Sequence, residues 1–266
     1  MQIKYFASVP YPEVTAQLER IAAAGLGLEI AVLDPHWILK VCELPMAAKL
    51  GQTLKEREIA INVQGPFLDL APGSLDPFIR EHTRKLFLRT VEIAGSLNAR
   101  NLTLYSGYNP LLHSKVLDQW YEVGLPLWRE VAETADRHGV RLCIANMFEE
   151  DPELQLRLIE GTSIQGTVGA CFDVANAFAF SRRKINAWIG ALAQYLYLVY
   201  LGDARNRESR PLPLEKSKVP YKEFFQVCMK RGLEPDLVFK MPAGESLEAL
   251  QTIRKLGLGQ LQIELL

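Results

Sequence analysis

The sequence predicts an α/β protein, and within that class a single (β/α)8 TIM barrel that spans residues 1–266. Short apolar runs alternate with longer segments of helical periodicity, which is typical of a parallel sheet. Eight such runs fit within 266 residues, the usual length of a closed barrel. No G-x-G follows the first run, "YFASVPYP", so an open doubly wound sheet that binds a dinucleotide is the second choice.

The predicted strands are short, apolar and separated by helical segments. In chain order they are Ile3–Ala7, Leu28–Val32, Ile59–Val63, Asn101–Tyr105, Arg141–Asn146, Thr167–Asp173, Tyr197–Leu201 and Leu237–Met241. These assignments place a strand before each of the main helical segments, as a barrel requires.

The helical segments carry start and stop signals. "PEVTAQLERIAAAG" begins near Pro12 and stops at Gly25, and "VLDQWYEVGLPLWREVAETADRHG" ends with His138 and Gly139. Helices are also predicted over "PFIREHTRKLFLRTVEIAGSL", "INAWIGALAQY" and "YKEFFQVCMKRG". "SLEALQTIRKLG" is predicted to open with Ser246 as its N-cap. The most polar segment, residues 202–220, is predicted to be a loop.

Composition narrows the classes of function. The net charge is −1, from 30 basic and 31 acidic residues, so neither a nucleic-acid nor a membrane surface is expected. The four cysteines are scattered without a C-x-x-C pair, which predicts no disulfide framework and no zinc knuckle. The N-terminus is too polar for a signal peptide, and no apolar run approaches 18 residues. We therefore expect a cytoplasmic protein; a homodimer is compatible with the sequence.

Barrel enzymes build their sites at the carboxyl ends of the strands. Here those ends carry polar side chains: Glu29, Gln64, Tyr105, Asn146, Asp173, Tyr200, Asp203 and Lys240. Polar groups that converge on one mouth predict a site for a small polar ligand. The ordinary alternative for Glu29 is an ion pair with a cation inside the barrel, and for the two tyrosines a role in the core.

Histidine is absent from these strand ends. His36, His82, His113 and His138 fall on helices or in loops. A histidine-rich zinc or manganese site is therefore not expected.

Five stretches carry a resemblance to a known family: "VQGPFLDLAPGSLDP", "YSGY", "IANMFEEDPE", "CFDVANAF" and "YLGD". In order and spacing they resemble the xylose isomerase-like TIM barrels, which include sugar-phosphate isomerases and epimerases and the endonuclease IV group. The resemblance runs from about Leu28 to about Lys240. It implies a barrel that holds one to three divalent metals at its mouth and acts on a sugar, a sugar phosphate or a phosphodiester.

The metal ligands that the resemblance implies are largely replaced. Histidines of the family pattern give way to Gln64, Tyr105, Asn176 and Tyr200, and its glutamates to Ala145 and Lys240. The "D-x-H" of the loop after strand seven reads Ser209-Arg210-Pro211. Asp173 is the one ligand kept, with Asp203 as a second oxygen donor for a weak magnesium site at most. We therefore predict no metal and no other cofactor.

Three functions are considered. Nucleic-acid cleavage is set aside because the chain lacks the zinc ligands and the basic charge that it requires, so two functions remain. The first is metal-independent acid/base chemistry of the isomerase or epimerase kind. Asp173 would be the base, Lys240 the electrophile or acid, and Tyr105 and Tyr200 the proton donors. The second is a non-catalytic relative that binds a small ligand or a partner protein. Under both, Asp173 is expected to approach Lys240 across the mouth.

The remaining ligand contacts are assigned to polar residues around that centre. Substrate-binding candidates are Glu29, Gln64, Asn146, Asn176, Asp203 and Arg205. Basic residues after strands six and seven, among them Arg182, Arg183 and Arg205, favour an anionic, carbohydrate-like substrate.

Overall fold

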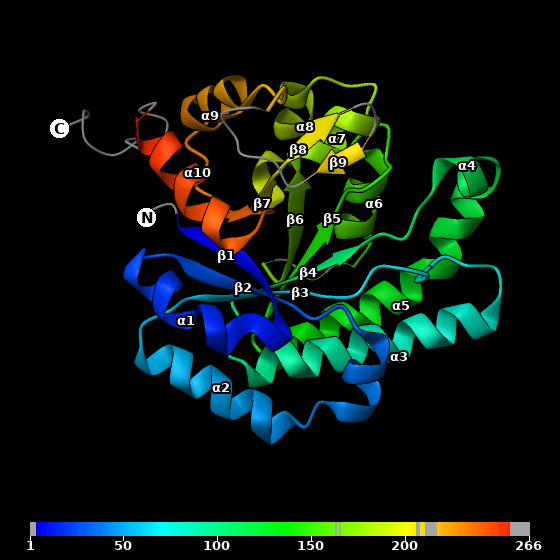
Figure 1. The fold of residues 1–266 in the computed structure, drawn as a ribbon. Helices are drawn as coiled ribbons and strands as arrows, with labels where there is room; N and C mark the ends of the chain where they lie inside the picture. Colours follow the sequence, from blue (N-terminus) through cyan, green and yellow to red (C-terminus); the bar gives the residue numbers. More distant parts are fainter. Residues whose placement is uncertain (1–3, 163, 165, 206–207, 211–216, 256–266) are drawn as a thin grey trace.

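The computed structural model describes residues 4–162, 164, 166–205, 208–210 and 217–255, and it is a closed parallel barrel (Figure 1). Going around the barrel, the strand order is β1-β10-β7-β6-β5-β4-β3-β2. The barrel strands are β1 (Tyr5–Pro10), β2 (Gly27–Ala31), β3 (Ile61–Gln64), β4 (Asn101–Tyr105), β5 (Arg141–Ala145), β6 (Val168–Asp173), β7 (Leu196–Leu201) and β10 (Asp236–Phe239). This confirms the predicted fold class.

Each barrel strand is followed by at least one helix on the outside of the barrel (Figure 1). The helices are α1 (Val14–Ala23), α2 (Leu44–Glu56), α3 (Pro77–Ser96), α4 (Pro110–His113), α5 (Leu117–Arg137), α6 (Glu153–Thr162), α7 (Val174–Phe180), α8 (Ile185–Leu192), α9 (Tyr221–Lys230) and α10 (Ala243–Lys255). Shorter turns are 3-10 helices at Tyr11–Glu13, Ser114–Val116 and Ala193–Tyr195 and a π-helical turn at Trp37–Val41. None of the helices in the described part of the chain is long and apolar enough to cross a membrane.

Most predicted boundaries agree with the structure to within two or three residues. Gly25 and Gly139 end their helices with φ values of 66° and 67°, in the left-handed region that the stop signals predicted. One cap prediction was wrong: α10 begins at Ala243, so Ser246 lies inside its first turn. There the Ser246 hydroxyl donates to the Pro242 carbonyl at 3.3 Å, because Ser inside a helix bonds back to the preceding turn.

Inward-pointing side chains fill the barrel. The apolar part of this filling is Phe6, Tyr105, Cys143, Ala145, Cys171, Leu198, Tyr200 and Val238. Gly27 leaves room for this packing, since a Cβ there would lie 2.4 Å from the Phe6 ring. The larger core lies outside, between the strands and the helices, and it includes Trp128 and Trp188. The apolar filling holds the strand ends rigid around the mouth.

The floor of the barrel is closed by a polar cluster. The Asn101 side-chain amide donates to Asn62 Oδ1 and to Asp236 Oδ2, both at 2.9 Å, and Arg100 lies 3.7 Å from Asp236. Burial raises the pKa of Asp236. Because these residues begin their strands, the cluster lies at the amino-terminal end, where barrels carry stability.

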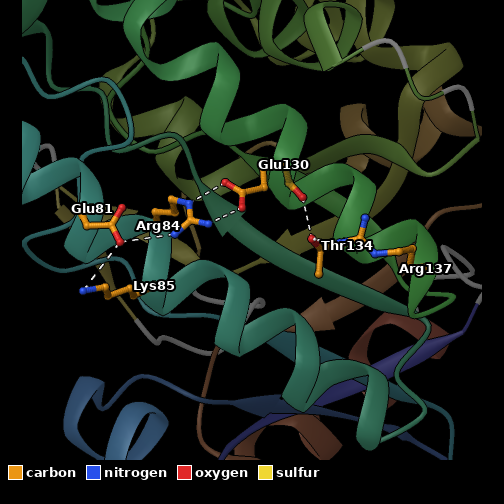
Figure 2. Close-up of polar contacts among 6 residues, drawn as sticks. All are labelled: Glu81, Arg84, Lys85, Glu130, Thr134 and Arg137. Carbon is orange, nitrogen blue, oxygen red and sulfur yellow. Dashed lines mark hydrogen bonds and ion pairs between the residues drawn. The ribbon is translucent and has the colours of Figure 1, made fainter.

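On the outside, α3 and α5 run side by side and are joined by an ionic contact (Figure 2). Arg84 of α3 reaches Glu130 of α5 with both Nε and Nη2, at 2.7 and 2.5 Å. Glu81 adds a weaker contact to Arg84, at 3.4 Å. The two-pronged geometry fixes the guanidinium against the carboxylate, so this pair joins the helices that follow β3 and β4.

The polar segment after β7 was predicted to be a loop and instead contains a hairpin. Strands β8 (Asp203–Arg205) and β9 (Glu208–Arg210) pair antiparallel, with Asp203 opposite Arg210. The Arg205 side chain and residues 206–207 and 211–216 lie outside the described residues. The hairpin follows β7 directly, so it stands beside the mouth of the barrel.

Candidate active site at the carboxyl end of the barrel

The structure brings together the side chains that the sequence placed at the strand ends. Glu29, Gln64, Tyr105, Asn146, Asp173, Asn176, Tyr200 and Asp203 are all buried, with exposures between 0% and 6%. Lys240 follows β10 and is partly exposed, with 24% of its side chain accessible. Buried polar groups that converge on the mouth of a barrel, beside one partly exposed lysine, support the hypothesis of a ligand site.

Lys240 sends its ammonium group toward β1, β2 and β3. Nζ lies 3.2 Å from Ser8 Oγ and 3.2 Å from Glu29 Oε1, and it also hydrogen-bonds to Gln64 Oε1. Its charge lies 4.5 Å from the centre of the Tyr200 ring, a cation–π distance. A lysine ammonium has three N–H donors, so these three oxygens satisfy all of them.

Lys240 and Asp173 form no direct ion pair, while their approach across the mouth through one water stays a prediction. Within the described residues the ion pair of Lys240 is made with Glu29, the alternative partner considered for that carboxylate. Lys240 acts on Asp173 through space, where its charge lowers the pKa of the carboxyl. The physical reason is reach: a four-carbon stem carries the ammonium away from its own strand end to the most buried acceptor available.

Glu29 is fully buried and only half satisfied. Oε1 accepts from Lys240 Nζ and from the Ser8 hydroxyl, the latter at 3.0 Å. Oε2 is buried without a hydrogen-bond partner among the described residues. A buried carboxylate oxygen without a donor costs free energy, so this oxygen is suited to accept a hydroxyl from a ligand.

Hydrogen bonds from Asn146 and Asn176 hold Asp173 in place. Its carboxylate caps α7 by accepting from the Asn176 backbone N–H at 2.9 Å. The Asn146 side chain forms two hydrogen bonds with the backbone of Asp173. The Asp173 N–H donates to Asn146 Oδ1 at 2.8 Å, and Asn146 Nδ2 donates to the Asp173 carbonyl at 3.0 Å. Asn176 Nδ2 in turn donates to the Asn146 carbonyl at 3.3 Å. The two asparagines therefore position the aspartate at the end of β6.

The Asp173 carboxyl titrates near neutral pH. Burial raises its pKa to about 7, against the lowering effects of the Asn176 N–H and the Lys240 charge. Both protonation states are thus populated at physiological pH, which is the condition for a general acid or base. Among the groups of the mouth, this carboxyl is best suited to move a proton.

The hydroxyls of Tyr105 and Tyr200 stay protonated at physiological pH. Burial raises the pKa of Tyr105 and of Tyr200 well above the usual range, and nearby Asp173 and Glu29 add to the effect. The Tyr200 hydroxyl lies near Thr103, but it has no partner in hydrogen-bond geometry among the described residues. The Tyr105 ring packs against Phe67, with 5.3 Å between centroids. A buried hydroxyl without a partner is available to a ligand oxygen.

Asp203 is turned toward the hairpin side of the mouth. Its Oδ1 accepts from the Ser217 hydroxyl at 2.5 Å. Next to it, Tyr221 of α9 hydrogen-bonds to both the N–H and the carbonyl of Gly202. Asp203 thus stabilises the segment that leads away from β7.

Glu149 and Ser8 belong to this region and were not found from the sequence. Glu149 lies in the loop after β5, is 2% exposed, and accepts from the Ser106 hydroxyl and from the Met147 N–H. Burial raises its pKa. The signal for it was an acidic run, "EED", just beyond a strand end. Ser8 carried no signal, because a lone serine in a strand has no distinguishing pattern.

Comparison with known proteins identifies the family. A family model described as xylose isomerase-like TIM barrel matches residues 15–256. The chain belongs to this family. Two Methanocaldococcus jannaschii relatives, the uncharacterized proteins MJ1188 and MJ1311, are 22% and 25% identical. The match to MJ1188 covers 71% of this chain and 69% of the relative, and that to MJ1311 covers 62% and 57%, so it spans less than two thirds of MJ1311.

Solved structures with the same fold align over nearly the whole chain. A D-tagatose 3-epimerase-like protein has a TM-score of 0.82 at 18% identity, covering 97% of this chain and 98% of its own. An L-ribulose 3-epimerase has a TM-score of 0.78 at 15% identity, covering 98% and 96%. The TTHB071 protein from Thermus thermophilus, from a crystal soaked with ZnCl2, has a TM-score of 0.77 at 26% identity, covering 96% and 98%. The xylose isomerase-like fold is thus established.

The donor set of this family member does not fit a divalent metal. The described residues contain no group of three or more His, Cys, Asp and Glu side chains that could hold an ion. At the ends of β5 and β10, where the resemblance implies glutamates, the chain has Ala145, which is apolar, and Lys240, which is cationic. A divalent ion needs several anionic or imidazole donors to displace its water, and the described residues of the mouth do not supply such a set.

Proposed function

We propose that this xylose isomerase-like barrel catalyses a proton shift on a small, polar, carbohydrate-like substrate without a divalent metal. The observation that carries the proposal is Asp173: a buried, rigidly held carboxyl whose pKa of about 7 suits proton transfer at physiological pH. The sugar isomerase and epimerase structures that share the fold are consistent with such a substrate class.

In this proposal the Asp173 carboxylate takes a proton from a carbon next to the substrate carbonyl. The electron pair of the C–H bond moves to the carbonyl oxygen, and a tyrosine hydroxyl, from Tyr200 or Tyr105, donates a hydrogen bond to the enolate that forms. Asp173, now protonated, returns the proton to the former carbonyl carbon, while the hydroxyl proton on the carbon that was deprotonated passes to the former carbonyl oxygen through the tyrosine hydroxyl. The carbonyl group thereby moves to the neighbouring carbon, and no oxidant or reductant is needed, because only two protons and the double bond change position.

Glu29 lies on the opposite side of the barrel from this base. Its strand, β2, is four positions from β6 in either direction around the barrel. The unpartnered Oε2 of Glu29 would accept a substrate hydroxyl, and Lys240 would neutralise the second oxygen. A polyhydroxylated carbon chain has the hydroxyls that this acceptor needs, which favours a carbohydrate over an apolar carbonyl compound.

A second function is a non-catalytic relative that binds such a ligand without converting it. The Lys240 ammonium favours this alternative, because its three N–H groups are all satisfied by the chain itself. An electrophile without a free proton contributes only through its charge. The two functions differ in whether the C–H bond of the ligand is broken.

The experiment is hydrogen–deuterium exchange on carbon. The protein is incubated in D2O at pD 8 with EDTA and a panel of aldoses, ketoses and their phosphates, and deuterium next to the carbonyl is followed by NMR. We expect exchange with at least one member, and a fall of about 10²-fold or more in Asp173→Asn. The matched control is Asp76→Asn, since Asp76 also caps a helix but lies on the exposed end of α3.

Exchange that persists in Asp173→Asn would refute Asp173 as the base. If wild-type protein exchanges no compound while members of the panel stabilise it against heat, the non-catalytic function is correct.

A further inference from the structure

The Lys240 ammonium sits in a shell that other strands provide. Its three hydrogen-bond acceptors come from Ser8 on β1, Glu29 on β2 and Gln64 on β3. The ring of Tyr200 on β7 covers a further side at 4.5 Å. Three oxygens and one aromatic face match the three donors and the charge of a primary ammonium.

The four residues that surround the ammonium, Ser8, Glu29, Gln64 and Tyr200, are here called the shell, and the aliphatic carbons of Lys240 are called the stem. The stem reaches into the shell from another strand end. Glu29 is fully buried and Gln64 is 3% exposed, whereas 24% of the Lys240 side chain is accessible. The stem therefore enters from the solvent side, and removing it would open a path to the shell. Truncation of Lys240 to alanine removes the atoms beyond Cβ, which are three carbons and the ammonium nitrogen. Propylammonium has the same three carbons and nitrogen.

The charge of the shell suits a monovalent cation. Glu29 is its one carboxylate, and Ser8, Gln64 and Tyr200 contribute neutral groups. One negative charge balances one ammonium, while a divalent ion would keep an unbalanced charge and find too few anionic donors. The buried, unpartnered Oε2 of Glu29 shows that no other cation among the described residues competes for this carboxylate.

We propose that Ser8, Glu29, Gln64 and Tyr200 form a binding site for a primary alkylammonium ion, which Lys240 fills from within the chain. In the wild type the ammonium is the cation of the mouth, and Lys240 is a positioning residue that holds Glu29. In a chain whose Lys240 side chain is cut back, the same site binds a free alkylammonium. This proposal does not depend on turnover, so it is tested without knowing the substrate.

The test is chemical rescue of stability in Lys240→Ala. Truncation leaves the buried Glu29 carboxylate unpaired, so we expect the melting temperature to fall by about 10 °C. Propylammonium chloride should restore much of this loss in a saturable manner, and it should leave the wild type unchanged. At the same ionic strength, KCl should give no comparable gain, and 1-propanol, which has the length but not the charge, should give none.

Lys240→Met is the matched control. Its unbranched side chain occupies the entry path without a charge, so propylammonium should not rescue it. Equal stabilisation of wild type, Lys240→Met and Lys240→Ala, or equal rescue by 1-propanol, would overturn the proposal. Greater rescue of Lys240→Ala by ZnCl2 than by propylammonium would overturn it too, because the shell would then be a metal site.

A second variant covers the case in which Lys240→Ala does not fold. Adding Glu29→Gln to Lys240→Met removes the uncompensated carboxylate, so the double variant should melt several degrees above Lys240→Met alone. A double variant no more stable than Lys240→Met would contradict a shell organised around this ion pair.

Discussion

Lys240 and Glu29 are 211 positions apart in the sequence, and their side chains form an ion pair with 3.2 Å between Nζ and Oε1. The pair joins the last barrel strand to the second, with β1 between them. Burial raises the pKa of Asp173 to about 7, and the Lys240 charge, which is paired with Glu29, lowers it only in part. The Asp173 carboxyl is therefore left without a direct ion pair among the described residues.

The raised pKa of Asp173 predicts a stability that depends on pH. An unfolded aspartate titrates near 3.9 and this one at about 7, so between these values the folded state binds a proton that the unfolded state lacks. Stability contributed by this residue is then present at pH 4 and is lost as the pH rises toward 7. Asn cannot ionise and is as good a helix cap, so Asp173→Asn should exceed the wild type at pH 8 by about 2–4 kcal/mol.

Urea denaturation at pH 5 and at pH 8 checks this expectation. The difference between variant and wild type should be several-fold larger at pH 8. A difference that is the same at both pH values would show that Asp173 is not protonated in the folded state. Asp76→Asn, at the exposed cap of α3, should show no gain in stability at pH 8.

The Tyr200 hydroxyl should matter to function and not to stability. It is buried without a partner in hydrogen-bond geometry among the described residues, so Tyr200→Phe should change the free energy of unfolding by less than about 0.5 kcal/mol, or raise it. Tyr221→Phe is the contrasting variant, because that hydroxyl bonds to both backbone groups of Gly202, and its loss should cost about 1–3 kcal/mol. Carbon–hydrogen exchange should fall in Tyr200→Phe. A large loss of stability there would mean that the hydroxyl has a structural partner.

The Arg84–Glu130 contact between α3 and α5 should make a small contribution to stability (Figure 2). Both side chains are 38% exposed, so water screens the pair, and Glu130→Gln should cost about 1 kcal/mol or less. Hydrogen bonding to Arg84 lowers the pKa of Glu130. Its contribution is therefore present above the unfolded value near 4.3 and is lost as the pH falls through the lowered folded value.

Thermal melts of wild type and Glu130→Gln at pH 7 and pH 3 measure this contribution. The gap between them should be smaller at pH 3 than at pH 7, because the unfolded state then binds the proton and the folded state begins to do so. Glu81→Gln, which removes only the longer contact to Arg84, should have a smaller effect at pH 7. A gap that widens on acidification would contradict the assignment.

Sequence patterns located the fold and most of the mouth because both follow from local rules. Alternation of apolar runs and helical periods fixed the strand ends, and a barrel brings strand ends together whatever their spacing in the chain. Glu29, Gln64, Tyr105, Asn146, Asp173 and Tyr200 could thus be assigned to one site from the residue pattern alone. Arg205 stays a prediction, because its side chain lies outside the described residues.

What could not be predicted depends on side-chain reach and on burial. A lysine stem can carry its charge to several strand ends, and only the packed interior decides that Lys240 meets Glu29 and not Asp173. The pKa of Asp173 is set by its depth, which the sequence does not encode locally. Of the basic residues expected to hold an anion, Arg182 is paired with Glu150 at 2.7 Å, a contact between two loops.

Elemental analysis of the wild-type protein tests the central claim most directly, because the claim is that an ammonium, and not a metal, is the cation of this mouth. The protein is purified without chelators, exposed to a slight excess of ZnCl2 or MnCl2, desalted, and measured by mass spectrometry of the elements. We predict far less than one zinc, manganese, iron or cobalt per chain, before and after exposure. About one tightly held metal per chain that is lost in Asp173→Asn would contradict the account.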